Sequence, residues 1–80
     1  MAYVVYGRED CGWCRMAKQF LGDRREEFRY IDISKDARSK AYLQAEGHKT
    51  VPQIYANDTH IGGYTDLVSH FGEGSYGDNV

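Results

Sequence analysis

The pattern of apolar and polar residues in the first half of the chain predicts a strand, a helix and a second strand. Residues 2–6 are an almost unbroken apolar run that ends at Gly7, which is typical of a strand buried on both faces. From Cys11 onward, apolar residues recur at helical spacing, and Gly22 stands where a left-handed C-terminal cap would be. In residues 28–33 aromatic residues alternate with other side chains, which predicts a second strand, most simply parallel to the first.

A second helix is predicted from Ser34 to about residue 46. The serine side chain offers an N-terminal cap, and Gly47 offers an end. Three alanines share one stripe of this predicted helix, at positions 37, 41 and 45.

After Pro52 the pattern predicts a hairpin. Residues 53–55 and 59–61 read as two short strands, and they flank Asn57 and Asp58. Because these two residue types tolerate positive φ, they suit the tight turn of an antiparallel pair.

A short last helix completes the order of elements. Gly62 and Gly63 break the hairpin, and Thr65 or Asp66 can cap a helix that carries Leu67, Val68 and Phe71. The order β-α-β-α-β-β-α predicts an α/β fold with a four-stranded mixed sheet flanked by three helices, the minimal thioredoxin-like layout. We expect one domain over residues 1–72, followed by a flexible tail over residues 73–80.

Composition and charge narrow the function classes. The chain has 80 residues, which is too short for two separate cores. Ten basic and twelve acidic residues interleave to a net charge of -2, so a nucleic-acid partner is not expected. The apolar start has no charged segment before it and ends at Gly7, so we expect no signal peptide and no membrane contact, and we place the protein in the cytoplasm.

The candidate chemistry lies in the motif Cys11-Gly12-Trp13-Cys14, which contains both cysteines. Cys11 stands at the N-terminal end of the first predicted helix, where unpaired amides and the helix dipole favour a thiolate. Cys14, one helical turn away, is placed to attack a mixed disulfide on Cys11 and to resolve it. Arg8 favours the thiolate, whereas the neighbouring carboxylates oppose it.

Two other interpretations of the motif are a zinc site and a pair of inert buried thiols. Zinc needs two further ligands, and His48, His60 and His70 do not form a second close pair at the spacing of a zinc finger. A Cys-x-x-Cys motif that opens a helix in a β-α-β context favours redox chemistry over both. No metal site is therefore expected from the residues alone.

Three blocks of sequence, in the same order and spacing, make the chain resemble the glutaredoxin family. They are Tyr6-Gly7-Arg8-Glu9-Asp10-Cys11-Gly12-Trp13-Cys14, then Thr50-Val51-Pro52-Gln53-Ile54, then Gly62-Gly63-Tyr64-Thr65-Asp66-Leu67. The resemblance covers residues 2 to about 71. It implies a glutathione-dependent enzyme that reduces protein disulfides and glutathione mixed disulfides.

The resemblance also implies a glutathione site. Pro52 is expected to be cis and to face Cys11, with the backbone of Val51 pairing with a peptide-like ligand and Thr50 shaping the groove. Gly63 allows close approach of the main chain, while the amides of Tyr64 and Thr65 and the side chain of Asp66 are expected to hold the γ-glutamyl end. From the residues alone, Thr65 and Asp66 read as a helix cap, and the two roles are compatible.

Two further contacts follow from the same comparison. Arg8, with Lys49 or Arg38, is expected to meet the glycine carboxylate of glutathione, because a guanidinium suits bidentate carboxylate binding. Trp13 stands where the family usually has tyrosine, and we expect it to contact the substrate, although packing explains an aromatic residue there equally well.

The motif departs from the family in having no proline, which leaves its redox potential open. Family members without that proline sometimes hold a [2Fe-2S] cluster between two subunits, so a cluster carrier with Cys11 as ligand is one alternative. The other alternative is a thioredoxin-like or NrdH-type redoxin recharged by thioredoxin reductase. The expected partners are glutathione, disulfide-containing proteins and, by resemblance, ribonucleotide reductase, and we expect a monomer.

Overall fold

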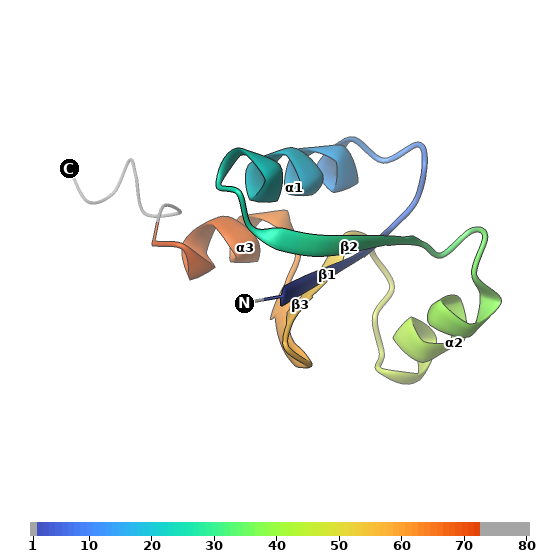
Figure 1. The fold of residues 1–80 in the computed structure, drawn as a ribbon. Coiled ribbons are helices and arrows are strands. Elements are labelled where there is room, and N and C mark those ends of the chain that lie inside the picture. Colours follow the sequence, from blue (N-terminus) through green and yellow to red (C-terminus); the bar gives the residue numbers. More distant parts are fainter. Residues whose placement is uncertain (1, 73–80) are drawn as a thin grey trace.

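The computed structural model describes residues 2–72, which form one mixed sheet with helices on both faces (Figure 1). The strands are β1 (Ala2–Gly7), β2 (Glu27–Asp32), β3 (Gln53–Ala56) and β4 (Thr59–Gly62), in the spatial order β2-β1-β3-β4. β2 runs parallel to β1, whereas β3 is antiparallel to both β1 and β4. The predicted thioredoxin-like layout is thus confirmed.

Two helices, α1 (Gly12–Asp23) and α3 (Tyr64–His70), cover one face of the sheet. Every second residue of β1 points to this face, and the core forms where these side chains meet the apolar stripes of both helices. The buried core residues include Val5, Ala17, Leu21, Ile54 and Leu67. Burial of this apolar surface fixes the start of α1 against the end of β1.

The third helix, α2 (Ala37–Ala45), lies on the opposite side of the sheet from α1 (Figure 1). It attaches to the sheet through Tyr42, whose ring lies 5.9 Å from the ring of Tyr6 and 6.0 Å from that of Tyr55. Its buried residue is Leu43, whereas the three alanines of the predicted stripe are exposed. An alanine buries too little apolar area to anchor a short helix when leucine and tyrosine are available.

The N-terminal caps of α2 and α3 also differ from the predictions. α2 begins after Asp36, whose carboxylate accepts a hydrogen bond from the backbone N–H of Ser39, so Ser34 is not its cap. Ser34 instead donates to Asp32 in the preceding turn. The cap of α3 is Gly63, two or three residues before the predicted caps Thr65 and Asp66, because Asp66 reaches back to the Gly63 N–H from inside the helix.

Two further predictions need correction at the first strand and the first helix. β1 is not buried on both faces: Tyr3 and Val5 are buried, but Val4 and Tyr6 are half-buried. α2 covers only part of the second face. α1 runs past Gly22, and the left-handed residue after the helix is Arg25, with a φ of 59°. By contrast, Asn57 and Asp58 have the positive φ values expected of the hairpin turn.

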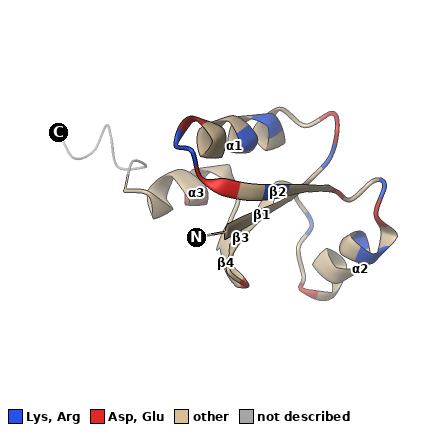
Figure 2. Cartoon of the chain, viewed as in Figure 1, with Lys and Arg blue, Asp and Glu red and all other residues tan. Residues whose placement is uncertain are grey.

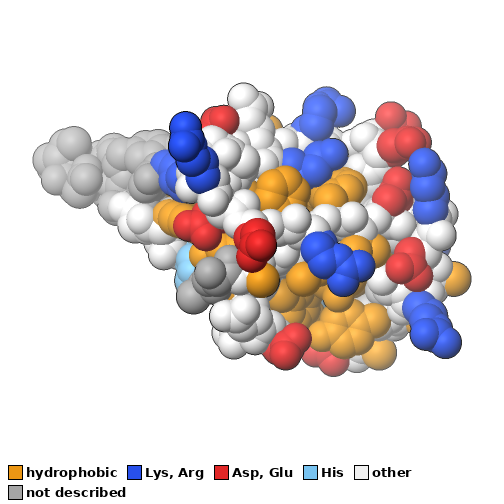
Figure 3. Space-filling model, in the orientation of Figure 1, with side chains coloured by type: hydrophobic (Ala, Val, Ile, Leu, Met, Phe, Trp, Pro, Cys, Tyr) orange, Lys and Arg blue, Asp and Glu red, His pale blue; other side chains and the backbone are white. Residues whose placement is uncertain are grey.

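Charged residues of both signs are interleaved along the chain (Figure 2), and on the face seen in Figure 3 they alternate with exposed hydrophobic side chains. Within residues 2–72, no helix is long and apolar enough to cross a membrane. The predicted tail, residues 73–80, lies outside the described residues.

Candidate active site

Cys11 is the N-cap residue of α1. Its backbone is extended (φ -134°, ψ 109°), and its Sγ atom accepts a hydrogen bond from the backbone N–H of Cys14 at 3.1 Å. The sulfur therefore takes the place that an N-cap oxygen usually has, beside the unpaired amides and the positive end of the helix dipole. This position favours the thiolate form of Cys11.

Cys14 lies in the first turn of α1 and is completely buried, whereas Cys11 is half-buried. The two residues are joined in a disulfide, with their Cα atoms 5.2 Å apart. Of the two sulfurs, the Cys11 sulfur is therefore the one that can react with a molecule from solution. The roles predicted for the pair, Cys11 as the nucleophile and Cys14 as the resolving thiol, stay predictions that are compatible with this burial.

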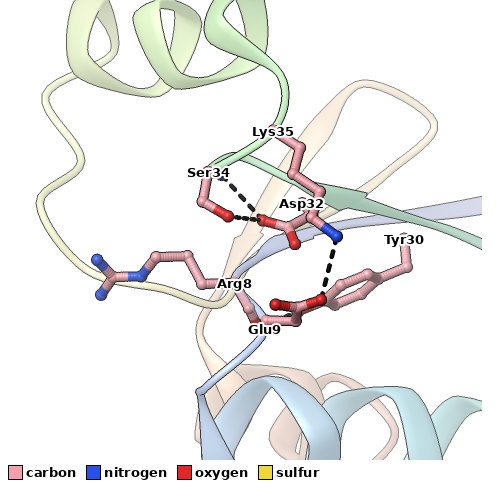
Figure 4. A network of polar contacts seen from close by, with 6 residues as sticks. All are labelled: Arg8, Glu9, Tyr30, Asp32, Ser34 and Lys35. Carbon is pink, nitrogen blue, oxygen red and sulfur yellow. Dashed lines mark hydrogen bonds and ion pairs between the residues drawn. The ribbon is translucent and has the colours of Figure 1, made fainter.

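The loop between β1 and Cys11 is tied to β2 and the turn after it (Figure 4). The hydroxyl of Tyr30 donates to the carbonyl oxygen of Arg8 at 2.8 Å, and Lys35 forms an ion pair with Glu9 at 3.1 Å. The hydrogen bond and the charge of Glu9 raise the pKa of Lys35. Asp32 accepts hydrogen bonds from the hydroxyl and the backbone N–H of Ser34, and these bonds lower the pKa of Asp32.

Opposite Cys11 lies the loop that precedes β3. The Val51–Pro52 peptide bond is cis, as expected, and the carbonyl oxygen of Val51 lies 3.9 Å from Cys11 Sγ. A carbonyl oxygen and a polarisable sulfur at this distance are in contact, so this loop forms a wall of the space around the nucleophile.

Two adjoining cavities, of about 180 and 470 Å³, share Thr50 and Val51 as their common wall. The smaller one contains the predicted residues Trp13, Thr50, Val51, Pro52, Gly63, Tyr64 and Thr65. The larger one contains the predicted Arg8 and Lys49 together with Ile33, Lys40, Gln44, Gly47 and His48. The structure thus brings together all but one of the ten residues predicted for the ligand site.

Charge is unevenly distributed between the two cavities. The cations Arg8, Lys40 and Lys49 line the larger one, which has no acidic residue in its wall. In Figure 4 the guanidinium of Arg8 extends away from Glu9 and Lys35. Arg38, on the same helix as Lys40, does not line either cavity. The larger cavity suits an anionic group, and the smaller one suits a neutral, partly apolar group.

Trp13 is 56 % exposed, and its ring lies 5.6 Å from the ring of Tyr64. Tyr64 in turn packs edge-on against Phe20 of α1. An indole that is held from one side and open on the other provides a stacking surface beside the nucleophile.

Asp66 is the exception among the predicted ligand residues. Its carboxylate accepts a hydrogen bond from the backbone N–H of Gly63 at 2.9 Å, and it lines neither of the two cavities beside Cys11. It lines a separate cavity with His60 and His70. The structure therefore shows the capping role and leaves the ligand-binding role of Asp66 a prediction.

Two residues of the site were not predicted. Lys40 is an exposed lysine in α2, and nothing in the local sequence distinguishes it from the other surface cations. Tyr30 belongs to the strand beside β1, and the parallel register pairs it with Val5. A predicted parallel register of the two strands could therefore have placed the Tyr30 side chain near the end of β1. Among residues 2–72, no group of three or more His, Cys, Asp or Glu side chains is arranged to hold a metal ion.

Comparison with known proteins shows which family the chain resembles. The family model described as Glutaredoxin matches residues 3–61. Glutaredoxin 1 of Escherichia coli is 39 % identical over 77 residues, which cover 86 % of this chain and 91 % of that protein. The crystal structure of a buckwheat glutaredoxin-glutathione complex has a TM-score of 0.73 at 27 % identity, covering 90 % of this chain and 71 % of that one.

The NrdH-redoxin of E. coli, described as a glutaredoxin-like protein with a thioredoxin-like activity profile, is also similar in structure. Its TM-score is 0.78 at 24 % identity, and the match covers 88 % of this chain and 93 % of that one. At this identity the similarity concerns the fold alone.

Proposed function

The chain belongs to the glutaredoxin family and is a thiol-disulfide oxidoreductase, and we propose that glutathione is the thiol that returns it to its dithiol form. The proposal rests above all on the paired cavities beside Cys11. A neutral cavity next to an aromatic platform and a cationic cavity share one wall, and that wall touches the sulfur. This arrangement suits a peptide-like thiol that ends in a carboxylate.

In the first half of the reaction, the Cys11 thiolate attacks one sulfur of a substrate disulfide. A bond forms between Cys11 and that sulfur, and the other sulfur leaves as a thiolate. The Cys14 thiolate then attacks Cys11 Sγ and releases the second substrate sulfur. The substrate has gained two electrons, and the enzyme holds the Cys11–Cys14 disulfide seen in the structure.

In the second half, a glutathione thiolate attacks Cys11 Sγ and frees Cys14. A second glutathione attacks the sulfur of the bound glutathione, which gives glutathione disulfide and restores the Cys11 thiolate. Attack at Cys11 rather than Cys14 follows from the burial of Cys14. The hydrogen bond from the Cys14 N–H stabilises Cys11 as the leaving group in this last step.

We assign the parts of glutathione to the two cavities. Arg8 and Lys49 receive the glycine carboxylate, and Lys40 adds a third positive charge to that cavity. The wall of Thr50, Val51 and Pro52 lies along the backbone of the tripeptide, while Trp13 covers its sulfur. Gly63, Tyr64, Thr65 and Asp66 are assigned to the γ-glutamyl end by the family resemblance.

The same surface serves a protein disulfide, and we propose ribonucleotide reductase as one protein substrate, with the enzyme acting as a cytoplasmic monomer. A cytoplasmic dithiol is kept reduced by the glutathione pool, which matches the proposed recharging step. A [2Fe-2S] cluster with Cys11 as a ligand stays an alternative, and it would need the reduced motif, in which Cys11 and Cys14 are not bonded to each other.

Turnover with alternative reducing systems tests the proposal. The enzyme is given a glutathione mixed disulfide with glutathione and glutathione reductase, and separately a protein disulfide with thioredoxin reductase. We expect turnover in the first system. Turnover only with thioredoxin reductase would instead assign the chain to the NrdH-type function.

A further inference from the structure

A chain of polar contacts on the α2 side of the sheet ends at the wall of the proposed glutathione site. Gln53, the first residue of β3, is a buried polar residue that is 7 % exposed. Its amide nitrogen donates to the carbonyl oxygen of Thr50 at 2.9 Å and lies 3.3 Å from the Thr50 hydroxyl. Its amide oxygen lies 2.7 Å from Nε2 of His60 on β4. Gln53 thus connects the sheet edge to the loop that carries Thr50.

The partners on its two sides determine the orientation of the Gln53 amide. The Thr50 carbonyl can only accept a hydrogen bond, so the atom that faces it must be the nitrogen of the amide. The oxygen then faces His60, and Nε2 of that ring must carry the hydrogen. If His60 offered no hydrogen, the amide oxygen would be left without this partner in a buried position, which is costly.

The surroundings of His60 keep its ring in one position and favour its neutral form. The ring of His48 stacks on it with centroids 4.3 Å apart, and His48 Nε2 lies 3.1 Å from the hydroxyl of Tyr55. Burial, and then the nearby imidazole of His48, lower the pKa of His60. The carboxylates of Glu46 at the end of α2 and Asp66 in α3 act in the opposite direction.

We propose that Gln53 is a positioning residue for the glutathione reaction, because it holds Thr50 in the wall beside Cys11 while His60 holds the Gln53 amide in the required orientation. The inference rests on the proposed function, since the position of Thr50 affects turnover only if the groove receives glutathione. Gln53 itself lies on the side of the sheet away from α1, so it acts through Thr50 and not on the sulfurs.

Kinetics of the variant Gln53→Met test the role in turnover. Methionine keeps the length of the side chain and removes its hydrogen bonds to Thr50 and His60. We expect KM for a glutathione mixed disulfide to rise about threefold to tenfold, as for the loss of one or two hydrogen bonds. We expect kcat to change less than about twofold, because the reacting groups are untouched. Gln19→Met, on the exposed face of α1, is the matched control and should leave both constants unchanged.

The variant His60→Phe separates positioning from a general effect on folding. Phenylalanine keeps a ring for stacking on His48 but has no hydrogen to donate, so KM should rise in the same direction as in Gln53→Met. An unchanged KM in both variants would overturn the inference. Equal losses of kcat and of thermal stability in both, with KM unchanged, would also overturn it, since they would indicate a purely structural role.

A titration followed by NMR tests the same link without glutathione. Between about pH 5 and pH 8, where histidine titrates, we expect the Thr50 amide resonance to shift with the midpoint of the His60 ring protons. In Gln53→Met the His60 ring should still titrate while the Thr50 shift with that midpoint disappears. A Thr50 resonance that ignores His60 in the unaltered enzyme would overturn the inference. Absence of glutathione turnover in the unaltered enzyme would overturn the proposed function and with it the role of Gln53 in that reaction, whereas loss of the NMR link with turnover intact would overturn the inference alone.

Discussion

A Cβ atom on Gly7 would lie 2.8 Å from Sγ of Cys14. The buried sulfur therefore occupies space that a larger residue at the end of β1 would fill. The same Cβ atom would also collide with the hydroxyl end of the Tyr30 ring. The absence of a side chain at Gly7 is therefore a condition for packing α1 and β2 around the end of β1. The conformation of Gly7 does not require glycine, since its φ is not positive.

Gly7→Ala is accordingly expected to destabilise the protein. The added methyl group forces Cys14 or Tyr30 to move in a packed interior, which typically costs about 1–3 kcal/mol. Gly22→Ala is the matched control, because a Cβ there meets nothing within 4 Å and the residue lies within α1. That variant should gain about 0.5–1 kcal/mol from helix propensity. Urea unfolding measures both, and equal stabilities of the two variants would contradict this description of the packing.

Asp66→Asn separates the two roles of Asp66. The asparagine oxygen still accepts from the Gly63 N–H, so the unfolding free energy should fall by no more than about 1 kcal/mol. The negative charge proposed to receive the ammonium group of glutathione is lost. We expect KM for a glutathione mixed disulfide to rise about tenfold, as for a hydrogen bond to a charged group.

Asp23→Asn, an exposed acidic residue near the end of α1, is the control for the change in net charge. If Asp66→Asn left KM at the control value, Asp66 would be a helix cap only. The γ-glutamyl end of glutathione would then need another partner.

Acid should destabilise the enzyme in part through His60. Its pKa in the folded protein is lowered from the ordinary value of 6.5, so the unfolded chain binds a proton more readily than the folded one. The contribution of the neutral ring to stability is complete above about pH 6.5 and is lost as the pH falls through the lowered pKa. Urea unfolding of the unaltered enzyme and of His60→Phe at neutral and mildly acidic pH measures this. An identical pH dependence in the two proteins would refute it.

Much of the fold could be predicted because the strong local signals agree with the tertiary structure. The Asn57-Asp58 turn needs only positive φ, and the apolar spacing of α1 matches the face that it buries. The helix α2 was predicted, but its start could not be placed correctly, since Ser34 and Asp36 are both good caps and local sequence does not decide between them.

The active site likewise has residues that local sequence predicts and residues that depend on the tertiary fold. Cys11 and Cys14 are predictable because helix geometry fixes their relation within one turn. The wall of the larger cavity is assembled from α2 and three separate loops, so the part that Lys40 plays in it depends on the tertiary fold. The same holds for the contact of Tyr30 with the loop at Arg8. Asp66 caps α3 and lies outside the walls of both cavities, so its proposed contact with glutathione rests on the family resemblance alone.

The central claim concerns the different roles of Cys11 and Cys14. It is tested most directly by turnover of a glutathione mixed disulfide, coupled to glutathione reductase, in Cys11→Ser and Cys14→Ser. We predict that Cys11→Ser has no activity, and that Cys14→Ser still reduces the glutathione mixed disulfide but no longer reduces protein disulfides. Activity surviving in Cys11→Ser, or full loss of mixed-disulfide turnover in Cys14→Ser, would contradict the account.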